Sequence, residues 1–413
     1  MSGMPKGDHV RAQGKNGLRV LHVIPSVAAV HGGPTRALQQ MLTAMAATNI
    51  SLEVATTDDD GRGRRIDRGA RSTVSFPATA AYFRKVSEFY KFAPGFLFWF
   101  WRRAKNYDVV HIHALFSFLS VVAGVICRLR GVPYILRPLG TLSGYGIVNR
   151  RPVLKRASLF LIEGPLLSHA AAVHFTSEAE LREAEQLSIP FRGVVVSLAV
   201  DVCARESRLS PALPSLVSGN GNTVLFLSRL DAKKNVEGLL NAMRLVLQRL
   251  PTARLIIAGS GETAYVATLK NLALELDIAA AVEWVGYVEG EAKATLLRNA
   301  NIYVLPSFSE NFGIAVAEAL AAGLPCVVAE GVAISSDIAE YGAGIVVSTD
   351  PQTIASGVIS LLEDADRRQM AARNASRLAV ERFSTEAMRA KLSALYNNVV
   401  KRVAAIDIPS AVA

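Results

Sequence analysis

The stretch that decides the fold is Pro306-Ser-Phe-Ser-Glu-Asn-Phe-Gly-Ile-Ala-Val-Ala-Glu318-Ala-Leu-Ala-Ala-Gly-Leu-Pro-Cys-Val-Val-Ala329. It follows an apolar run at 301–305 and predicts a strand end, a polar turn with a glycine, an alanine-rich helix and a second buried strand. Backbone N–H groups at the helix start, around residues 311–314, form an anion site together with the helix dipole. Glu310 precedes this site and Glu318 lies in the helix. An anion held there would have a carboxylate at each end, which suits a sugar attached to a diphosphate.

The composition predicts a large α/β protein with anionic partners. The chain has 413 residues, 51% of them hydrophobic, which allows two or three domains with sizeable cores. Its net charge of +10 and pI ≈ 9.6 favour phosphates, anionic lipid surfaces or nucleic acid. No nucleic-acid-binding signature is present, so we expect no nucleic acid partner. Cys127, Cys203 and Cys326 are far apart and outside any CxxC spacing, which indicates reduced thiols in a cytoplasmic protein.

The order of patterns along the chain predicts two domains. Residues 1–17 are polar and basic, without the apolar run of a signal peptide, and read as a disordered leader. No apolar stretch reaches the ~18 to 20 residues of a membrane helix. Strands alternate with helices at 18–204 and again at 223–384, which predicts two doubly wound parallel sheets facing a central cleft. Residues 205–222 read as the linker, and 385–413 as a C-terminal helix that packs back across the domains, then a tail.

Two features of the first domain lie in turns that follow strands. The first strand leads into Gly32-Gly33-Pro34 and a helix, an arrangement that brings backbone close to phosphate but is also common in ordinary tight turns. After the second strand, the acidic run 58–60 could serve as a ribose-binding acid or a metal-binding pair. Because Gly61-Arg-Gly-Arg-Arg65 follows at once, we interpret it as a solvated, self-neutralising surface loop.

The segment 83–105 combines aromatic and basic residues. Nine aromatic side chains from Phe83 to Trp101 are mixed with arginines and lysines, and the segment ends in a basic cluster. Such a segment suits the surface of an anionic membrane or a groove for a lipid-linked acceptor. The alternative is two helices, separated at Pro94-Gly95, that bury their aromatic residues in the domain core. The sequence leaves both interpretations open.

Four side chains on loops or strand ends are candidate binding residues. The strand at 107–113 ends in His111 and His113, which leave the same face. A metal site would need a third ligand, and none is evident from the sequence. His113 lies at the carboxyl end of a strand and is therefore expected to face the ligand cleft. Arg229 and Lys234, five residues apart after the strand at 223–227, can converge on a diphosphate at the helix start.

Together these motifs resemble glycosyltransferase family 4, the retaining GT-B enzymes. The resemblance is carried by four stretches and spans about residues 18–400: Ser228-Arg-Leu-Asp-Ala-Lys-Lys234, Pro306–Pro325 with its paired glutamates, Val110-His-Ile-His113, and Gly32-Gly33. It implies GT-B architecture, with an acceptor domain at 18–204 and a nucleotide-sugar donor domain at 223–384. It also implies hexosyl transfer with retention and no metal or other cofactor.

The resemblance also assigns roles to residues. Glu310 and His113 would act at the sugar and acceptor, and Glu318 would bind the ribose. The donor diphosphate would be bound by Arg229, Lys234, Gly33, Asn311, Phe312, Gly313 and Ile314. Two positions depart from the family pattern. Asn235 replaces a glycine that commonly follows the lysine, and Val196–Asp201 replaces a Pro-Asn-Gly turn.

The expected function follows from these assignments. The donor would be a UDP- or GDP-sugar, and the acceptor a glycan or a lipid-linked molecule in cell-envelope polysaccharide synthesis. The protein would be cytoplasmic and peripheral on the inner face of the membrane, through 83–105. A two-domain nucleotide-sugar epimerase and a non-catalytic, membrane-associated nucleotide-sugar-binding protein are the alternatives. A nicotinamide-dependent oxidoreductase would share the architecture, but the chain lacks GxGxxG.

Overall fold

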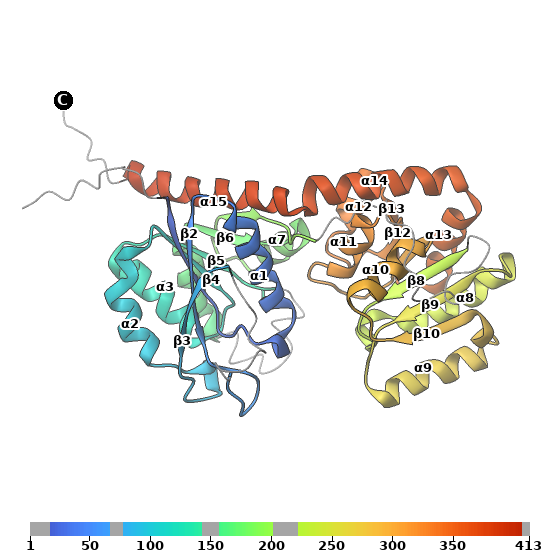
Figure 1. Ribbon diagram of the computed structural model, residues 1–413, viewed down its shortest axis with the longest axis horizontal. Coiled ribbons are helices and arrows are strands. Elements are labelled where there is room, and N and C mark those ends of the chain that lie inside the picture. Colours follow the sequence, from blue (N-terminus) through green and yellow to red (C-terminus); the bar gives the residue numbers. More distant parts are fainter. Residues whose placement is uncertain (1–16, 67–76, 143–156, 201–221, 407–413) are drawn as a thin grey trace, which may run out of the picture. The chain divides into compact units, whose positions relative to one another are not determined.

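The computed structural model describes residues 17–66, 77–142, 157–200 and 222–406 (Figure 1). Almost all of the predicted leader and of the predicted linker, together with Cys203, lie outside the described residues. The chain divides into two compact units. One consists of Met1–Leu136, His169–Ala171 and Tyr396–Ala413, and the other of Arg137–Ser168 and Ala172–Leu395.

The first sheet has the strand order β3-β2-β1-β4-β5-β6-β7 within the described residues. Its strands are β1 (Arg19–Val23), β2 (Ser51–Thr57), β3 (Thr79–Phe83), β4 (Val109–His113), β5 (Tyr134–Arg137), β6 (Ala172–Phe175) and β7 (Gly193–Val195). The pairs β1–β2, β1–β4, β2–β3 and β6–β7 are parallel. The strand order reverses between β1 and β4, and ligands of doubly wound sheets bind at the carboxyl ends of the strands at such a reversal.

Helices pack on both faces of this sheet. In Figure 1, α2 and α3 lie on one side of it and α1 on the other. The helical segments are η1 (Ala29–His31), α1 (Gly33–Ala46), η2 (Phe89–Lys91), α2 (Gly95–Arg103), η3 (Ala104–Asn106), α3 (Phe118–Arg130), η4 (Leu159–Glu163), α6 (Gly164–His169) and α7 (Glu178–Glu185). Ser117 caps α3 by accepting a hydrogen bond from the Ser120 amide, and Gly131 ends it in the left-handed conformation.

The second sheet has the order β10-β9-β8-β11-β12-β13, and all five of its pairings are parallel. Its strands are β8 (Thr223–Leu227), β9 (Arg254–Ala258), β10 (Val282–Gly286), β11 (Ile302–Leu305), β12 (Cys326–Ala329) and β13 (Gly344–Val347). Here the order reverses between β8 and β11. The buried, nearly continuous apolar runs are typical of parallel strands that are covered on both faces. The predicted pair of doubly wound parallel sheets is therefore confirmed.

The helices of the second half alternate with its strands. They are η5 (Ala232–Lys234), α8 (Val236–Arg249), α9 (Thr263–Glu275), η6 (Ala279–Ala281), α10 (Gly290–Asn299), α11 (Ile314–Ala321), α12 (Ser335–Tyr341), α13 (Pro351–Glu363), α14 (Ala365–Phe383) and α15 (Thr385–Ile406). Among the described helices, none combines the length and the apolar character that crossing a bilayer requires.

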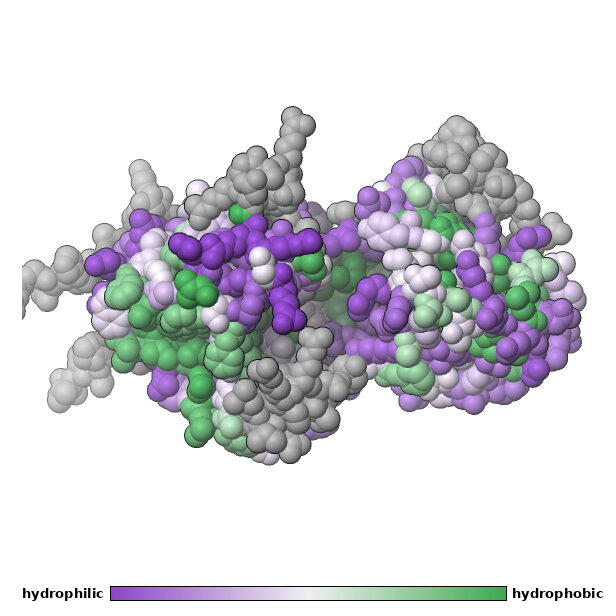
Figure 2. Space-filling view, turned by 90° about the horizontal axis from the view of Figure 1, so that it is seen from below, coloured by the Kyte–Doolittle hydropathy of each residue, from purple (hydrophilic) through white to green (hydrophobic). Residues whose placement is uncertain are grey.

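The aromatic segment 83–105 is divided between core and surface. In α2, Phe96 and Phe100 are fully buried and stack at 5.3 Å between ring centroids, whereas Leu97, Phe98 and Trp101 are exposed. Helix α3 packs against α2 and exposes Leu129 in turn. Apolar side chains gather on the face of the first unit that Figure 2 shows. Phe96 and Phe100 therefore fit the core interpretation, and contact of the exposed side chains with a membrane or an acceptor stays a prediction.

Candidate functional site

The loops at the strand reversal of the second sheet bring together two of the predicted site residues. Strands β8 and β11 are neighbours, and the hydroxyl of the buried Tyr303 in β11 donates to the Leu227 carbonyl at the end of β8 at 3.0 Å. Lys234 follows β8 and Glu310 follows β11. The Phe308 amide donates to the Lys233 carbonyl at 3.0 Å, which joins the two loops directly. The geometry of this pair is thus set by the fold.

Lys234 lies in a tightly capped turn. Asp231 accepts a hydrogen bond from the Lys233 amide at 3.0 Å and so begins the short helix η5. Asn235 then adopts the left-handed conformation (φ 54°, ψ 46°), which asparagine tolerates better than most residues. Its side chain accepts from the Gly238 amide at 3.2 Å and donates to the Thr349 carbonyl at 2.9 Å. Asparagine can therefore replace the family's glycine here, and it also caps α8.

Glu310 is fixed through its backbone. Its amide donates to the Gly331 carbonyl at 2.8 Å, and its carbonyl accepts from the Ala333 amide at 3.2 Å. Position 331 requires glycine, because a Cβ there would collide with the carbonyl group of Phe308. The loop after β12 thereby holds the loop after β11 in place.

The two charged groups meet in a nearly buried ion pair. The Lys234 ammonium contacts Glu310 Oε1, and the hydroxyl of Ser307 donates to the same oxygen at 3.1 Å. The side chains of Lys234 and Glu310 are 8% and 16% exposed. Because an ammonium group has three N–H donors, Lys234 can keep this partner and still donate to a ligand.

The start of α11 adjoins Glu310 in the sequence. Gly313 has φ 86° and caps the helix, and no side chain caps it. Phe312 is buried and packs edge-on against Phe383, with 5.5 Å between ring centroids. Among the described residues, no group accepts a hydrogen bond from the amides of Phe312, Gly313 or Ile314. The predicted binding of an anion by these amides stays a prediction.

Glu318 and Arg229 have different surroundings from this pair. Glu318 projects from α11 and accepts a hydrogen bond from Lys293 of α10 at 2.7 Å. Arg229 is 82% exposed, and its guanidinium lies 3.8 Å from Asp231. Among the described contacts the structure therefore joins Lys234 to Glu310, and it joins neither of them to Arg229 or Glu318.

Sequence reasoning missed two polar partners in this region. Ser307 lies in the stretch that carries the glutamates, and its position three residues before Glu310 is a usable signal. Lys293 lies on a helix whose pattern gives no hint of its contact with Glu318. Only the three-dimensional packing of α10 beside α11 places it there.

The first unit contains a column of three buried histidines. His22 on β1 lies opposite His111 on β4 in the strand register, so the structure places a third histidine, which was not evident from the sequence, beside His111 and His113. The rings are stacked, with centroids 4.5 to 5.3 Å apart and interplanar angles of 17° to 29°. One ring nitrogen of each histidine lies within 4.8 Å of the others, a spacing at which three imidazoles could hold a metal ion. His22 Nδ1 and His113 Nε2 are 2.9 Å apart and share a hydrogen bond.

A tyrosine of α15 contacts this column of histidines. The Tyr396 hydroxyl on α15 lies 3.0 Å from His111 Nδ1, and both side chains are fully buried. His113 is also fully buried, and the loop after it has positive φ angles at Ala114 (74°) and Phe116 (55°). Non-glycine residues in this region are strained, and such strain clusters at functional sites. A direct contact of His113 with a sugar stays a prediction.

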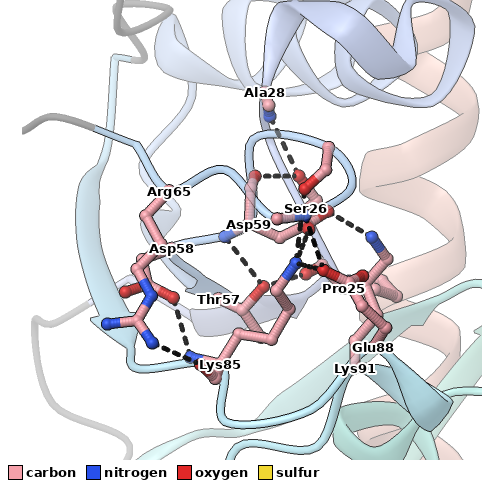
Figure 3. A network of polar contacts seen from close by, with 12 residues as sticks. Pro25, Ser26, Ala28, Thr57, Asp58, Asp59, Arg65, Lys85, Glu88 and Lys91 are labelled. Carbon is pink, nitrogen blue, oxygen red and sulfur yellow. Dashed lines mark hydrogen bonds and ion pairs between the residues drawn. The ribbon is translucent and has the colours of Figure 1, made fainter.

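The acidic loop after β2 corrects one sequence interpretation. Asp59 is not solvated: its side chain is fully buried, and Figure 3 shows it surrounded by polar groups. It pairs with Lys85 and Lys91 from the segment after β3, and with His31 at 2.7 Å. The arginines that follow it in sequence do not neutralise it. The partners come from loops that are distant in sequence, which the local charge pattern could not reveal.

The electrostatics of this cluster favour a charged carboxylate. Burial alone raises the pKa of Asp59, but hydrogen bonds from Lys85, Lys91 and His31 outweigh burial and hold the pKa below its ordinary value. Lys85 is buried as well. Its hydrogen bonds with Asp59 and Glu88 outweigh its own desolvation and raise its pKa. The cluster is therefore a set of ion pairs inside the unit.

Two family models match the chain. One, described as glycosyl transferases group 1, matches residues 214–378, and the other, a glycosyl transferase 4-like domain, matches residues 32–199. The first match contains Lys234, Glu310 and Glu318, and the second contains Gly33 and His113. The two models thus cover all of the predicted site residues.

Relatives with known names are also glycosyltransferases. A phosphatidyl-myo-inositol mannosyltransferase of Mycobacterium tuberculosis is 33% identical over 46% of this chain and 50% of that protein. A D-inositol 3-phosphate glycosyltransferase of Corynebacterium efficiens is 27% identical over 74% of each protein. The chain spans about half the length of the curated relatives it matches at higher identity.

A solved structure shares the fold. The HepE protein of Anabaena, solved in complex with UDP, superposes with a TM-score of 0.73 at 18% identity, over 92% of this chain and 100% of that one. This likeness confirms the GT-B fold that the motifs predict. The two family models, which between them match both halves of the chain, show that it belongs to the group 1 glycosyl transferases.

Proposed function

We propose that the protein transfers a sugar from a nucleoside diphosphate sugar to an acceptor hydroxyl, with retention and without a metal ion. The observation that carries the proposal is the nearly buried Lys234–Glu310 ion pair, at the strand reversal of the second sheet and beside the start of α11. Ligands of doubly wound sheets bind at this place. The solved HepE complex with UDP supports a uridine diphosphate donor.

The chemistry requires a fixed positive group at the leaving diphosphate. As the bond between the anomeric carbon and the phosphate oxygen breaks, its electron pair moves to that oxygen. The Lys234 ammonium and the amides at the start of α11 would stabilise the developing charge. The acceptor oxygen would attack from the same face of the sugar, and its proton would pass to the departing phosphate oxygen. Configuration at the anomeric carbon is then retained.

The two glutamates would have separate tasks. Glu310, held by Lys234 and Ser307, would orient the transferring sugar and support the positive charge that develops at its anomeric carbon. Glu318, four residues after the first residue of α11, would accept hydrogen bonds from the ribose hydroxyls. Its partner Lys293 keeps that carboxylate in place in the donor-free protein.

The proposal is tested by a thermal-shift panel of UDP-, GDP- and ADP-sugars with the full chain. A donor that binds the folded state raises the unfolding temperature by mass action, and the shift grows with donor concentration. We expect one nucleotide class to give such a shift. The shifted donor is then incubated without acceptor, because an epimerase would convert its sugar and a transferase would not. No shift with any nucleotide-sugar contradicts the proposal.

Glu318→Gln is expected to weaken donor binding about tenfold. The amide oxygen accepts a weaker hydrogen bond than a carboxylate oxygen does, and the amide N–H group cannot accept one from the ribose hydroxyls. The dissociation constant of the donor is measured by calorimetry. Glu291→Gln is the matched control, since Glu291 lies on α10 and pairs only with Arg298 among the described residues. An unchanged donor affinity in Glu318→Gln would rule out its ribose role.

We further propose that the acceptor is lipid-linked and that α2 and α3 contact an anionic membrane. Phe98 and Leu129 are 63% and 68% exposed, next to the exposed Trp101. Cations lie beside them: the Arg130 guanidinium lies 5.1 Å from the Trp101 ring, and Arg102 and Arg103 lie in the last turn of α2. Apolar side chains rimmed by arginine suit the interface of an anionic bilayer.

The variant Phe98→Ser with Trp101→Ser is expected to bind vesicles about tenfold more weakly, because it removes aromatic surface that would enter the interface. Binding is measured by sedimentation with vesicles of equal parts phosphatidylglycerol and phosphatidylcholine. Leu274→Ser is the control, since Leu274 is similarly exposed on α9 of the other unit. Binding that is equal for all three proteins would exclude this surface.

A further inference from the structure

The buried carboxylate of Asp59 connects three loops at one end of the first sheet. Asp59 itself follows β2, and Lys85 and Lys91 come from the segment after β3 (Figure 3). His31 comes from the segment after β1. All of these loops leave the carboxyl ends of their strands, where ligands of such sheets bind. One side chain therefore determines how these loops are arranged with respect to each other.

The network contains more partners than charge neutralisation requires. Lys85 alone, itself nearly buried, supplies a cation to Asp59 Oδ1. His31 and Lys91 approach the other oxygen, Oδ2, from positions that are 32% and 27% exposed. Two partly exposed side chains thus contact one buried oxygen atom. These contacts tie the segments that carry His31 and Lys91 to Asp59.

The His31 contact fixes the start of α1. His31 is the last residue of η1 and directly precedes Gly32, whose φ of 58° and ψ of −105° are accessible only to glycine. Gly32 and Gly33 are exposed, and no atom lies within 4 Å of the Cβ position of either. Packing therefore does not hold this turn. The turn is held by a hydrogen bond on each side. Before it, the His31 ring bonds to the Asp59 carboxylate, and after it, the Arg36 amide donates to the Gly32 carbonyl at 3.1 Å.

The backbone of Asp59 is itself held on β1 and β2. Its carbonyl accepts a hydrogen bond from the Ser26 hydroxyl at 2.8 Å, and the Ser26 hydroxyl oxygen accepts from the Ala28 amide at 3.2 Å. The Thr57 hydroxyl donates to the Pro25 carbonyl at 2.6 Å. These hydrogen bonds fix Asp59 relative to the sheet. Because His31 is bonded to Asp59, the segment after β1 is fixed relative to the sheet as well.

We propose that Asp59 is a positioning residue for donor binding: through His31 it holds the Gly32–Gly33 turn, at the carboxyl end of β1, in the conformation that contacts the donor. The proposal rests on the proposed function for the identity of the ligand. Neither Asp59 nor His31 touches the reacting atoms. Their contribution is that the turn is already ordered when the donor arrives, so that binding does not have to order it.

The test compares His31→Leu with His31→Gln. Leucine fills a similar volume without a donor, whereas the glutamine amide can still donate to Asp59 Oδ2. We expect His31→Leu to raise the donor KM about tenfold with kcat within about threefold of the parent, and His31→Gln to stay near the parent in both. Amide hydrogen exchange across residues 29–36 is expected to accelerate in His31→Leu and not in His31→Gln.

Asp59→Asn and Asp60→Asn complete the series. Asp59→Asn is expected to reproduce the effects of His31→Leu on KM and exchange. Asp60→Asn makes the same chemical change at the neighbouring residue, whose side chain has no described partner, and is expected to behave as the parent. If Asp59→Asn does not fold, the two His31 variants decide alone.

The outcomes separate this proposal from the proposed function. The positioning role would be overturned if His31→Leu had the same donor KM and the same amide hydrogen exchange as the parent. It would also be overturned if His31→Leu and His31→Gln raised the donor KM by the same factor. If the parent binds no nucleotide-sugar, the proposed function fails, and the exchange measurements still show whether His31 and Asp59 order the turn.

Discussion

Lys234→Ala is expected to lower the rate of sugar transfer about 100- to 1,000-fold, which is the effect of removing one preorganised group that stabilises charge in a transition state. The Lys234 side chain is only 8% exposed, so water cannot readily replace its ammonium group at the leaving diphosphate. The loss is expected mainly in kcat, because the charge on the bridging oxygen develops as the bond breaks. Initial rates are measured with the donor that the thermal-shift panel identifies.

The neighbouring lysine provides the control. Lys233→Ala removes the same charge from the same turn and keeps the carbonyl that accepts from Phe308, so its turnover is expected to stay within about twofold of the parent. Lys234→Ala also leaves the Glu310 carboxylate without its cation, so unfolding temperatures of both variants are measured. Turnover near the parent value in a folded Lys234→Ala protein would contradict the proposed function.

Glu310→Gln is expected to lower kcat about 100-fold with little change in the donor KM. The amide keeps the size of the side chain and still accepts from Ser307, so the variant removes little besides the negative charge. That charge would support the positive character of the anomeric carbon, which exists only in the transition state. Steady-state kinetics over a range of donor concentrations separate the two constants.

The control for this variant is Glu330→Gln, an exposed carboxylate in the loop after β12 whose described contacts are through its backbone. Its kcat is expected to match the parent. A second measurement addresses the mechanism itself. Mass spectrometry of the parent protein, quenched during turnover, is expected to show no sugar attached to Glu310, and such an adduct would replace the orienting role by a covalent one.

The fold was predictable because each strand of the second sheet carries its own signal. Ile302–Leu305 and Cys326–Ala329 are short, buried apolar runs, and a glycine turn and an alanine-rich helix separate them. Parallel strands need such a helical connection, so the pattern permits few alternatives. The same stretch places Glu310 and the start of α11 at a strand end, which is why the main site residues could be named from the sequence.

The contacts between loops were not predictable, because they depend on strand register and on which loops meet. Asp59 appeared as part of a solvated acidic run, and its real partners lie on the loop after β3. His22 is a polar residue in a buried strand, which was a usable signal. Its contact with His113 follows only once β1 is known to pair with β4. The direct pairing of Lys234 with Glu310 likewise depends on β8 lying beside β11.

Tyr396 has a consequence for the order in which the protein folds during synthesis. Its hydroxyl completes the histidine column of the first unit, although it lies close to the end of the chain. The ribosome releases β1 and β4 long before it releases α15. The nascent first unit therefore gains this hydrogen bond, and the burial that Tyr396 provides, only after the whole second sheet has been made. The packing around His111 is therefore complete only after α15 has been synthesised.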